Sequence, residues 1–182
     1  MPRKLGIDNT QYQHQFTRRW FLNRNYPTFV EYILPKYKSQ PTFYFEIGVF
    51  EGMSPVSMMQ PVLLHPKSKA VATDPHLATR KLNGETMEDV RSRAIHNIKP
   101  YADKCKLFRF NSIEIMRKMH DRGGFAGVKK DTLDLAMIDG DHTDLAAWSD
   151  ARMVLPLLKP GGWMLWDDVE NDKAKKNHVK DG

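Results

Sequence analysis

The sequence predicts an α/β fold in which helices cover both faces of a doubly wound, mostly parallel sheet. From residue 42 onward, short β-rich runs alternate with longer segments of helical period, which is the pattern of such a sheet. The 182 residues suffice for one domain with a core and are too few for two. Because apolar residues make up 41% of the chain and charged residues 27%, disordered and fibrous proteins are excluded.

Five runs are expected to form the strands of this sheet. They are Thr42–Ile47, Ala70–Thr73, Lys106–Phe110, Leu133–Ile138 and Trp163–Trp166. After the first run, Ser54 is expected to cap a helix that begins at Pro55. Thr86 and Asp89 have the spacing of a capping box, which predicts a helix start ahead of Val90–Ile98.

Three further segments have helical character. Ser112 opens one of them, and Asp144 opens another that extends to Leu155. The aromatic-rich stretch Phe16–Tyr37 is helical in pattern but is interrupted by Pro27. We expect this stretch to pack across the substrate side or one face of the sheet.

The formal charge of +6 would suit a polyanionic partner such as nucleic acid. The basic residues are spread along the whole chain, and the densest cluster, three lysines between positions 173 and 176, includes an intervening alanine and adjoins an aspartate. Nucleic acid is therefore the less favoured partner. No apolar run approaches the roughly 20 residues of a membrane helix, and no signal-type stretch follows the amino terminus, so we expect a soluble, cytoplasmic protein.

The most informative segment, Glu46–Ser54, ends a predicted strand and leads into a helix. Gly48 and Gly52 permit a backbone turn and close ligand approach, and the helix start offers amide donors to an anionic group. The G-x-G-x-x-G spacing of pyrophosphate sites is absent, which argues against a dinucleotide. Asp74 ends the next strand, where a carboxylate can accept hydrogen bonds from ribose hydroxyls. A simple strand-to-helix turn and a helix-capping aspartate are the alternatives.

Carboxylates also follow the last two predicted strands. Asp139 and His142 lie in an Asp-Gly-Asp-His sequence after one strand, and Asp167 and Asp168 follow the other. Ligands of open parallel sheets bind beyond the carboxyl ends of the strands, so these residues are expected to face the same crevice as the glycine loop. Three carboxylates on adjacent strand ends repel one another unless they are protonated, solvated or bound to a cation, and oxygen ligands suit Mg²⁺. The alternatives are a helix cap for Asp139 and a structural role for His142.

Together these residues resemble the cofactor site of class I S-adenosylmethionine-dependent methyltransferases, over residues 20 to 169. By that resemblance the acidic-Gly-x-x-x-Gly loop wraps the methionine moiety, Ser54 meets its carboxylate, and Asp74 holds the ribose. Asn111 and Ser112 would lie beside the adenine, although Ser112 could equally cap a helix. The implied cofactor-binding residues are Glu46, Gly48, Gly52, Ser54, Asp74, Asn111, Ser112 and Asp139.

The Asp-Gly-Asp-His signature is typical of metal-dependent O-methyltransferases that act on sugars and other small molecules, and it is similar to catechol O-methyltransferase at the same strand ends. This resemblance implies a divalent cation, Mg²⁺, with Asp139, Asp167 and Asp168 as ligands. It also implies His142 as the general base and Asp139 as a second catalytic residue. The expected reaction is metal-assisted O-methylation of a small hydroxylated acceptor such as a sugar, natural product or phenol.

Two other functions compete with this one. An RNA methyltransferase is favoured by the basic charge, but the Asn/Asp-Pro-Pro-Tyr signature of base-methylating enzymes is absent after the fourth strand. A ribose-methylating arrangement of Asp139, Lys159 and Glu170 is disfavoured because Lys159 is expected in a tight turn at 158–162. The other alternative is a catalytically silent module that binds S-adenosylmethionine.

The resemblance also implies the organisation of the chain. Residues 1–40 would be a helical cap on the substrate side, residues 41–170 the Rossmann-like S-adenosylmethionine-binding core, and residues 171–182 the start of a truncated helix. The strand order would be 3-2-1-4-5, without the terminal hairpin that completes the family's 3-2-1-4-5-7-6 sheet. Trp163–Trp166 would then form an open edge, through which homo-oligomers could associate.

Overall fold

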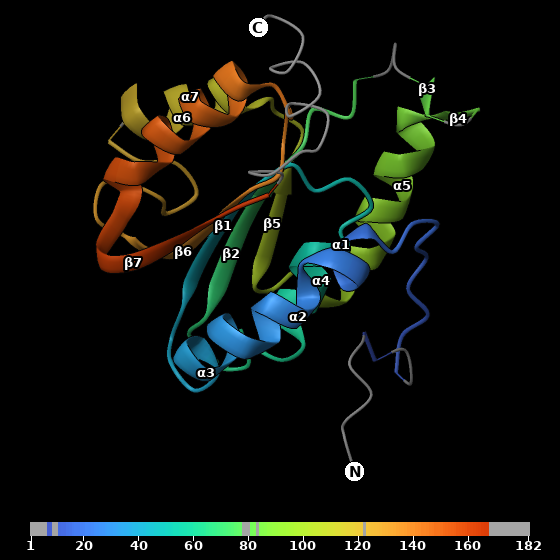
Figure 1. The fold of residues 1–182 in the computed structure, drawn as a ribbon, viewed down its shortest axis with the longest axis horizontal. Helices are drawn as coiled ribbons and strands as arrows, with labels where there is room; N and C mark the ends of the chain where they lie inside the picture. Colours follow the sequence, from blue (N-terminus) through green and yellow to red (C-terminus); the bar gives the residue numbers. More distant parts are fainter. Residues whose placement is uncertain (1–6, 9–10, 78–80, 83, 122, 168–182) are drawn as a thin grey trace, which may run out of the picture.

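The computed structural model describes residues 7–8, 11–77, 81–82, 84–121 and 123–167. A five-stranded parallel sheet lies at its centre (Figure 1), in the order β5-β2-β1-β6-β7. The strands are β1 (Phe43–Ile47), β2 (Lys69–Thr73), β5 (Cys105–Phe108), β6 (Leu133–Ile138) and β7 (Leu158–Trp166). Numbered along the chain within this sheet, the order is 3-2-1-4-5, which confirms the predicted topology. A separate short hairpin joins β3 (Lys81–Leu82) and β4 (Glu85–Thr86).

Helices cover both faces of the sheet. They are α1 (Trp20–Arg24), α2 (Tyr26–Thr28), the π-helix η1 (Phe29–Ile33), α3 (Leu34–Tyr37), α4 (Met53–Met59), α5 (Met87–Ile98), α6 (Ser112–Asp121) and α7 (Asp144–Val154). Two 3₁₀ turns, η2 (Lys99–Tyr101) and η3 (Leu155–Leu157), follow α5 and α7. In Figure 1, α6 and α7 lie on one side of the sheet and α1 to α5 on the other.

The core is divided between the two faces of the sheet because neighbouring strand residues point in opposite directions. Phe45 and Ile47 belong to the cluster that includes α6 and α7, whereas Tyr44 belongs to the cluster that includes α1 to α5. Every residue of β1 is buried, as expected for the central strand of a sheet covered on both faces. Each large apolar side chain buried in this way contributes about 1.5–3 kcal/mol to stability.

One helix start and one helix cap differ from the sequence prediction. Gly52, not Ser54, is the N-cap of α4, and the helix begins at Met53 because the amide of Val56 already bonds to the carbonyl of Gly52 (3.1 Å). The hydroxyl of Ser54 donates to Glu46 instead of capping the helix. At α6 the cap is Asn111, whose Oδ1 accepts the amide of Glu114 at 2.9 Å.

The predicted starts of α5 and α7 and the interruption near Pro27 are confirmed. The side chain of Thr86 accepts the amide of Asp89 at 3.2 Å, and the Asp89 carboxylate accepts the amide of Thr86 at 3.1 Å, so the capping box of α5 is complete. Helix α7 begins at Asp144, as predicted. The aromatic stretch forms α1 to α3, with a break at Asn25, because Pro27 has no amide to bond to the carbonyl of Asn23.

The segment predicted as a tight turn at 158–162 is part of β7. Leu158 pairs with Leu133, and the next pairing joins Trp163 to Leu135, so residues 159–162 bulge out of the ladder. Gly161 has a φ of +78° within this bulge, which glycine adopts without strain. Among the described strands, β7 lies at an edge of the sheet. Within the residues that the structure describes, no helix has the length and apolar character needed to cross a bilayer.

Candidate active site at the carboxyl ends of the strands

Four of the predicted site residues lie side by side at the carboxyl ends of the strands. Asp74, Gly48, Asp139 and Asp167 immediately follow β2, β1, β6 and β7. The amide of each donates to the carbonyl of the last residue of the neighbouring strand, at 3.2, 2.9, 2.8 and 3.0 Å respectively. Because adjacent strands lie about 4.8 Å apart, the four residues are neighbours in the order of the sheet.

Gly48 is in direct backbone contact with Asp139. Gly48 has a φ of +85°, and a Cβ atom added to it would lie 1.8 Å from the carbonyl oxygen of Asp139. No side chain fits in that space. The start of the glycine loop and the start of the Asp-Gly-Asp-His segment therefore share one backbone junction.

Asp74 supports the glycine loop through its carboxylate. Its Oδ2 accepts the amides of Val49 and Phe50, both at 2.9 Å, and its Oδ1 accepts the amide of His76 at 2.8 Å. A carboxylate offers about four acceptor positions, so this one keeps capacity for a further donor. The ribose-binding role of Asp74 remains a prediction, and the structure adds a loop-supporting role.

Glu46 lies beneath the glycine loop and is fully buried. Its carboxyl group is bonded by the hydroxyls of Ser54 and Tyr44, the latter at 2.8 Å. Burial raises the pKa of Glu46 to about 8, although the bonds from Ser54 and Tyr44 oppose this shift. The group therefore keeps its proton at neutral pH. Burial beside Glu46 likewise raises the pKa of Tyr44 well above its usual value.

The residues after β5 are engaged in local structure. Asn111 is the cap of α6, and the hydroxyl of Ser112, the first residue of that helix, bonds to the buried carboxylate of Asp150 on α7. Burial raises the pKa of Asp150 despite this bond, and the nearby charge of Asp141 adds to the rise. The predicted adenine contacts of Asn111 and Ser112 are not tested by this arrangement.

The segment after β6 carries the predicted catalytic residues. Asp139 is half-buried, whereas Asp141 and His142 are exposed. The Oδ1 atom of Asp141 accepts the amide of Thr143 at 2.9 Å, which forms the turn that leads into α7. The side chain of His142 is exposed to solvent near the carboxyl end of β6.

A complete metal site is not present within the part of the chain that the structure describes. There, no three His, Cys, Asp or Glu residues are grouped as metal ligands would be. Of the predicted ligands, Asp139 and Asp167 follow adjacent strands, and Asp168 lies outside the described residues. The predicted C-terminal helix start at 171–182 and Glu170 also lie outside them.

Lys159 is far from the predicted catalytic residues along the strands. Its Nζ lies 2.6 Å from Oδ1 of Asp134, near the start of β6, whereas Asp139 follows the end of the same strand. Lys159 is the second residue of β7, so its backbone lies at the amino-terminal end of the strands. This placement disfavours the ribose-methylating arrangement.

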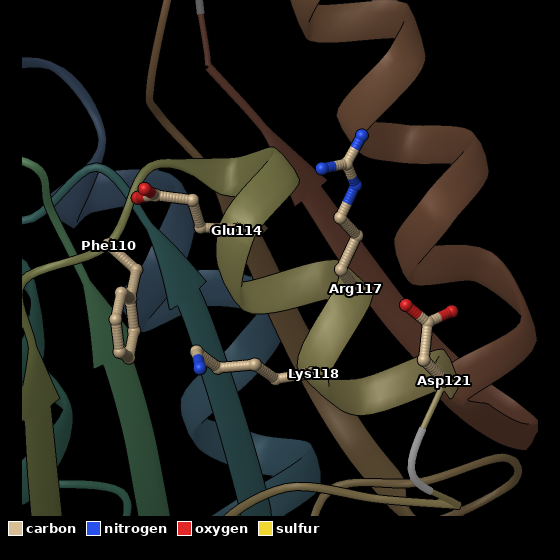
Figure 2. Close-up of a pocket in the computed structure, with 5 residues that line it drawn as sticks. All are labelled: Phe110, Glu114, Arg117, Lys118 and Asp121. Carbon is tan, nitrogen blue, oxygen red and sulfur yellow. The ribbon is translucent and has the colours of Figure 1, made fainter.

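Two hollows are lined by residues of β5 or by residues that follow it. One, of about 340 Å³, is formed by Phe110 and four residues of α6: Glu114, Arg117, Lys118 and Asp121. Figure 2 shows the Lys118 side chain reaching toward the Phe110 ring, and its Nζ lies 4.8 Å from the ring centroid. The other, of about 280 Å³, lies between α5 and β5 and includes His76, Phe108 and Arg109 at its strand-end side. None of the predicted cofactor-binding residues lines either hollow.

Sequence reasoning missed two buried polar residues next to the glycine loop. Glu51 lies inside the loop and is 1% exposed. His76, also 1% exposed, places its Nε2 at 2.8 Å from the carbonyl of Phe50, so that nitrogen carries the proton. The contacts of Glu51 with Thr17 and of His76 with Phe50 join residues more than 20 positions apart, so no local pattern indicated these roles. An acidic residue directly before Gly52 was the one available signal.

The chain matches a methyltransferase family model, and its fold resembles solved methyltransferases. A family model described as a methyltransferase domain matches residues 45–169. The fold resembles a SAM-dependent O-methyltransferase from Thermotoga maritima, with 15% identity, a TM-score of 0.54, and coverage of 94% of this chain and 51% of that one. It also resembles an S-adenosylhomocysteine-bound methyltransferase from Podospora anserina, with 15% identity, a TM-score of 0.51, and coverage of 75% and 56%. This chain thus spans about half the length of those proteins. No curated protein sequence matches it.

Proposed function

This chain belongs to the family of methyltransferase domains, and from that premise we propose that it transfers a methyl group from S-adenosylmethionine to a hydroxyl of a small acceptor. The acceptor class would be a sugar, a natural product or a phenol. The observation that supports this proposal is the row of Asp74, Gly48, Asp139 and Asp167 at adjacent strand ends. Ligands of open α/β sheets bind beyond that edge.

In this proposal the glycine loop and Asp74 hold the cofactor. The tight backbone at Gly48 and Gly52, with φ of +85° and +80°, allows a ligand to approach the main chain closely. Asp74 already orients the amides of the loop and has acceptor capacity left for a ribose hydroxyl. When bound, S-adenosylmethionine supplies an electrophilic methyl group on a sulfonium centre.

The carboxylates after β6 and β7 have the chemistry of a divalent cation site. Asp139 and Asp167 offer oxygen donors at adjacent strand ends, which is the ligand type that Mg²⁺ prefers, and Asp168 is the next residue. When bound there, the cation would lower the pKa of the acceptor hydroxyl. The protein from Thermotoga maritima with a similar fold is an O-methyltransferase, which is consistent with oxygen as the acceptor atom.

In this proposal, His142 removes the proton of the acceptor hydroxyl. His142, exposed at the same edge, accepts the hydroxyl proton in its neutral form and later releases it to solvent. Bound S-adenosylmethionine would supply its methyl group to the acceptor oxygen, and its sulfur would keep the electron pair of the broken carbon–sulfur bond. Asp139 holds the adjoining backbone in place through its contact with Gly48.

An RNA acceptor is the second candidate, and the formal charge of +6 favours it. The pairing of Lys159 with Asp134 weighs against the ribose-methylating version. A silent binding module is the third candidate.

A methyl-transfer screen with and without Mg²⁺ separates these candidates. Hydroxylated sugars, phenols and short RNA are incubated with the protein and labelled cofactor, and S-adenosylhomocysteine binding is titrated in parallel. We expect transfer to a small acceptor that excess chelator abolishes. Transfer to RNA alone would favour the second candidate, and binding without transfer the third. Absence of cofactor binding would overturn the proposal.

A further inference from the structure

Glu51 is a buried carboxylate in the glycine loop that the proposed reaction does not use. Its oxygens accept four hydrogen bonds, three of them from the chain's amino-terminal part. The donors are the amide of Thr17 (2.8 Å), the hydroxyl of Thr17 (2.6 Å), the amide of Arg18 (3.3 Å) and the Nε of Arg93 (2.6 Å). A carboxylate this deeply buried is tolerated only when charge and hydrogen bonds compensate it.

Residues 11–20, which we call the N-terminal strap, run beside α5 (Figure 1). The hydroxyl of Tyr12 donates to the carbonyl of His96 at 2.6 Å. The backbone of Gln15 forms two hydrogen bonds with the side chain of Asn97, at 2.6 and 2.8 Å. The amide of the same Asn97 side chain also donates to the carbonyl of Glu51 at 2.8 Å, so the strap and the loop share this partner.

The strap ends against the outer side of the glycine loop. The ring of Trp20 stacks on Phe50, with centroids 5.0 Å apart and planes 27° from parallel. The amide of Phe50 donates to Asp74 on the other side. The loop is therefore fixed from two directions, by Asp74 after β2 and by the strap through Glu51.

We propose that Glu51 is a positioning residue that docks the N-terminal strap on the glycine loop, so that strap docking and cofactor binding strengthen each other. This inference rests on the proposed binding of S-adenosylmethionine to that loop. The loop conformation that presents Gly48 and Gly52 to the cofactor is the one in which Glu51 meets Thr17. When the strap is released, Glu51 keeps only one of its four hydrogen bonds, the one from Arg93. The loop must then move so that water can reach the Glu51 carboxylate.

Thermodynamic linkage makes this proposal quantitative. If docking raises the affinity for S-adenosylhomocysteine by some factor, bound S-adenosylhomocysteine must suppress strap release by the same factor. Couplings of this kind commonly amount to about 5–150-fold. A residue that merely stabilised the fold would not produce equal factors in the two measurements.

The first measurement is the dissociation constant of S-adenosylhomocysteine, determined by calorimetry on the full chain. Glu51→Gln is expected to raise it about 10-fold, and Thr17→Val, which removes one hydroxyl donor, by less. Thr17→Val also keeps the test available if Glu51→Gln does not fold. Glu88→Gln is the matched control, since the half-exposed Glu88 of α5 pairs with Arg91 (2.9 Å) and Arg109 (3.2 Å) rather than with the strap. It should bind like the wild type.

The second measurement is the rate of tryptic cleavage after Arg18 and Arg19, which requires the strap to leave the loop. Without ligand, Glu51→Gln should be cleaved faster than the wild type and Glu88→Gln at the same rate. At a low trypsin concentration the cleavage rate follows the equilibrium population of released strap. Under that condition, saturating S-adenosylhomocysteine should slow cleavage of the wild type by the factor by which Glu51→Gln raises the dissociation constant.

The outcomes distinguish the two proposals. Equal binding by wild type and Glu51→Gln, with cleavage unaffected by ligand, would overturn the role of Glu51 and leave the methyltransferase proposal standing. If the wild type does not bind S-adenosylhomocysteine, the proposed function and the linkage fail together, even where Glu51→Gln frees the strap.

Discussion

Gly48 and Asp139 meet through their backbones, at a position where a Cβ on Gly48 would lie 1.8 Å from the carbonyl oxygen of Asp139. Gly48 opens the loop proposed to bind the cofactor, and Asp139 opens the segment proposed to carry out the chemistry. The contact therefore fixes the position of the glycine loop relative to the segment that begins at Asp139. A change that separates β1 from β6 at this point must displace both.

Gly48→Ala tests this junction. The added methyl group cannot fit against a backbone carbonyl, and the φ of +85° adds strain. We therefore expect the free energy of unfolding to fall by about 3 kcal/mol or more. Binding of S-adenosylhomocysteine should be lost as well. Gly84→Ala is the matched control, because Gly84 has a φ of +87° and an added Cβ would meet no atom of the described residues within 4 Å, so only the strain of about 1 kcal/mol remains. Equal losses in urea denaturation of the two variants would contradict the close contact.

Substitutions of Asp74 separate its loop-supporting role from ribose binding. Asp74→Ala leaves the amides of Val49 and Phe50 without their acceptor, which should cost about 1–3 kcal/mol and weaken S-adenosylhomocysteine binding more than 10-fold. Asp74→Asn keeps one acceptor oxygen for these amides, so most of the stability should remain while the affinity still falls. Wild-type affinity of Asp74→Asn in calorimetry would restrict this residue to supporting the loop.

The sequence carried most of the fold because its local signals agreed with the tertiary structure. The alternation of strands and helices, the capping box at Thr86 and the order of the sheet are all present in the structure. The start of α4 was wrong because Ser54 is drawn inward by Glu46, a contact between residues on different elements. Pairing across the sheet also decides that 159–162 is a bulge within β7, which a turn-like composition cannot reveal.

The candidate site was predicted less completely than the fold. Strand ends can be read from the sequence, so the row from Asp74 to Asp167 follows from the order of the strands. The network of Glu51 with Thr17 and the bond of His76 to the loop depend on segments that meet only in the folded chain. Contacts between distant segments of this kind produce no periodic pattern in the sequence.

Asp139→Asn tests the role of the carboxylates in the reaction. We expect methyl transfer to be abolished while S-adenosylhomocysteine binds nearly as in the wild type, because the proposed cation acts on the acceptor. Chelation of the wild type should have the same effect, with recovery on addition of Mg²⁺. Full activity in excess chelator would remove the cation from the mechanism.

His142→Gln tests the general base. A glutamine cannot take the hydroxyl proton, so the rate at neutral pH should fall roughly 100-fold or more, without loss of stability because the side chain is exposed. The measurement is the initial rate across pH 6 to 9 with the acceptor found in the screen. An unchanged rate at neutral pH would make His142 a surface residue without a catalytic role.

Glu46 should make the stability of the protein fall as the pH rises. Burial raises the pKa of its carboxyl from 4.5 to about 8, so the native protein keeps a proton that the unfolded chain has already released. Between these two values unfolding releases that proton, and the free energy of unfolding therefore decreases with pH, by at most about 1.4 kcal/mol for each unit. The contribution is fully present below pH 4.5 and is lost as the pH passes 8.

Glu46→Gln isolates this effect, because an amide resembles the neutral carboxyl and can still accept the hydroxyl of Ser54, but it does not titrate. The comparison is urea denaturation of both proteins at pH 5, 6, 7 and 8. We expect the stability of Glu46→Gln relative to the wild type to increase steadily across this range, since only the wild type must bury a group that tends to ionise. Other titrating groups, including Asp150, contribute equally to both proteins and cancel in the difference. Parallel curves would mean that Glu46 is already ionised in the native state, and its bonds from Ser54 and Tyr44 would then have to be strong enough to offset its burial.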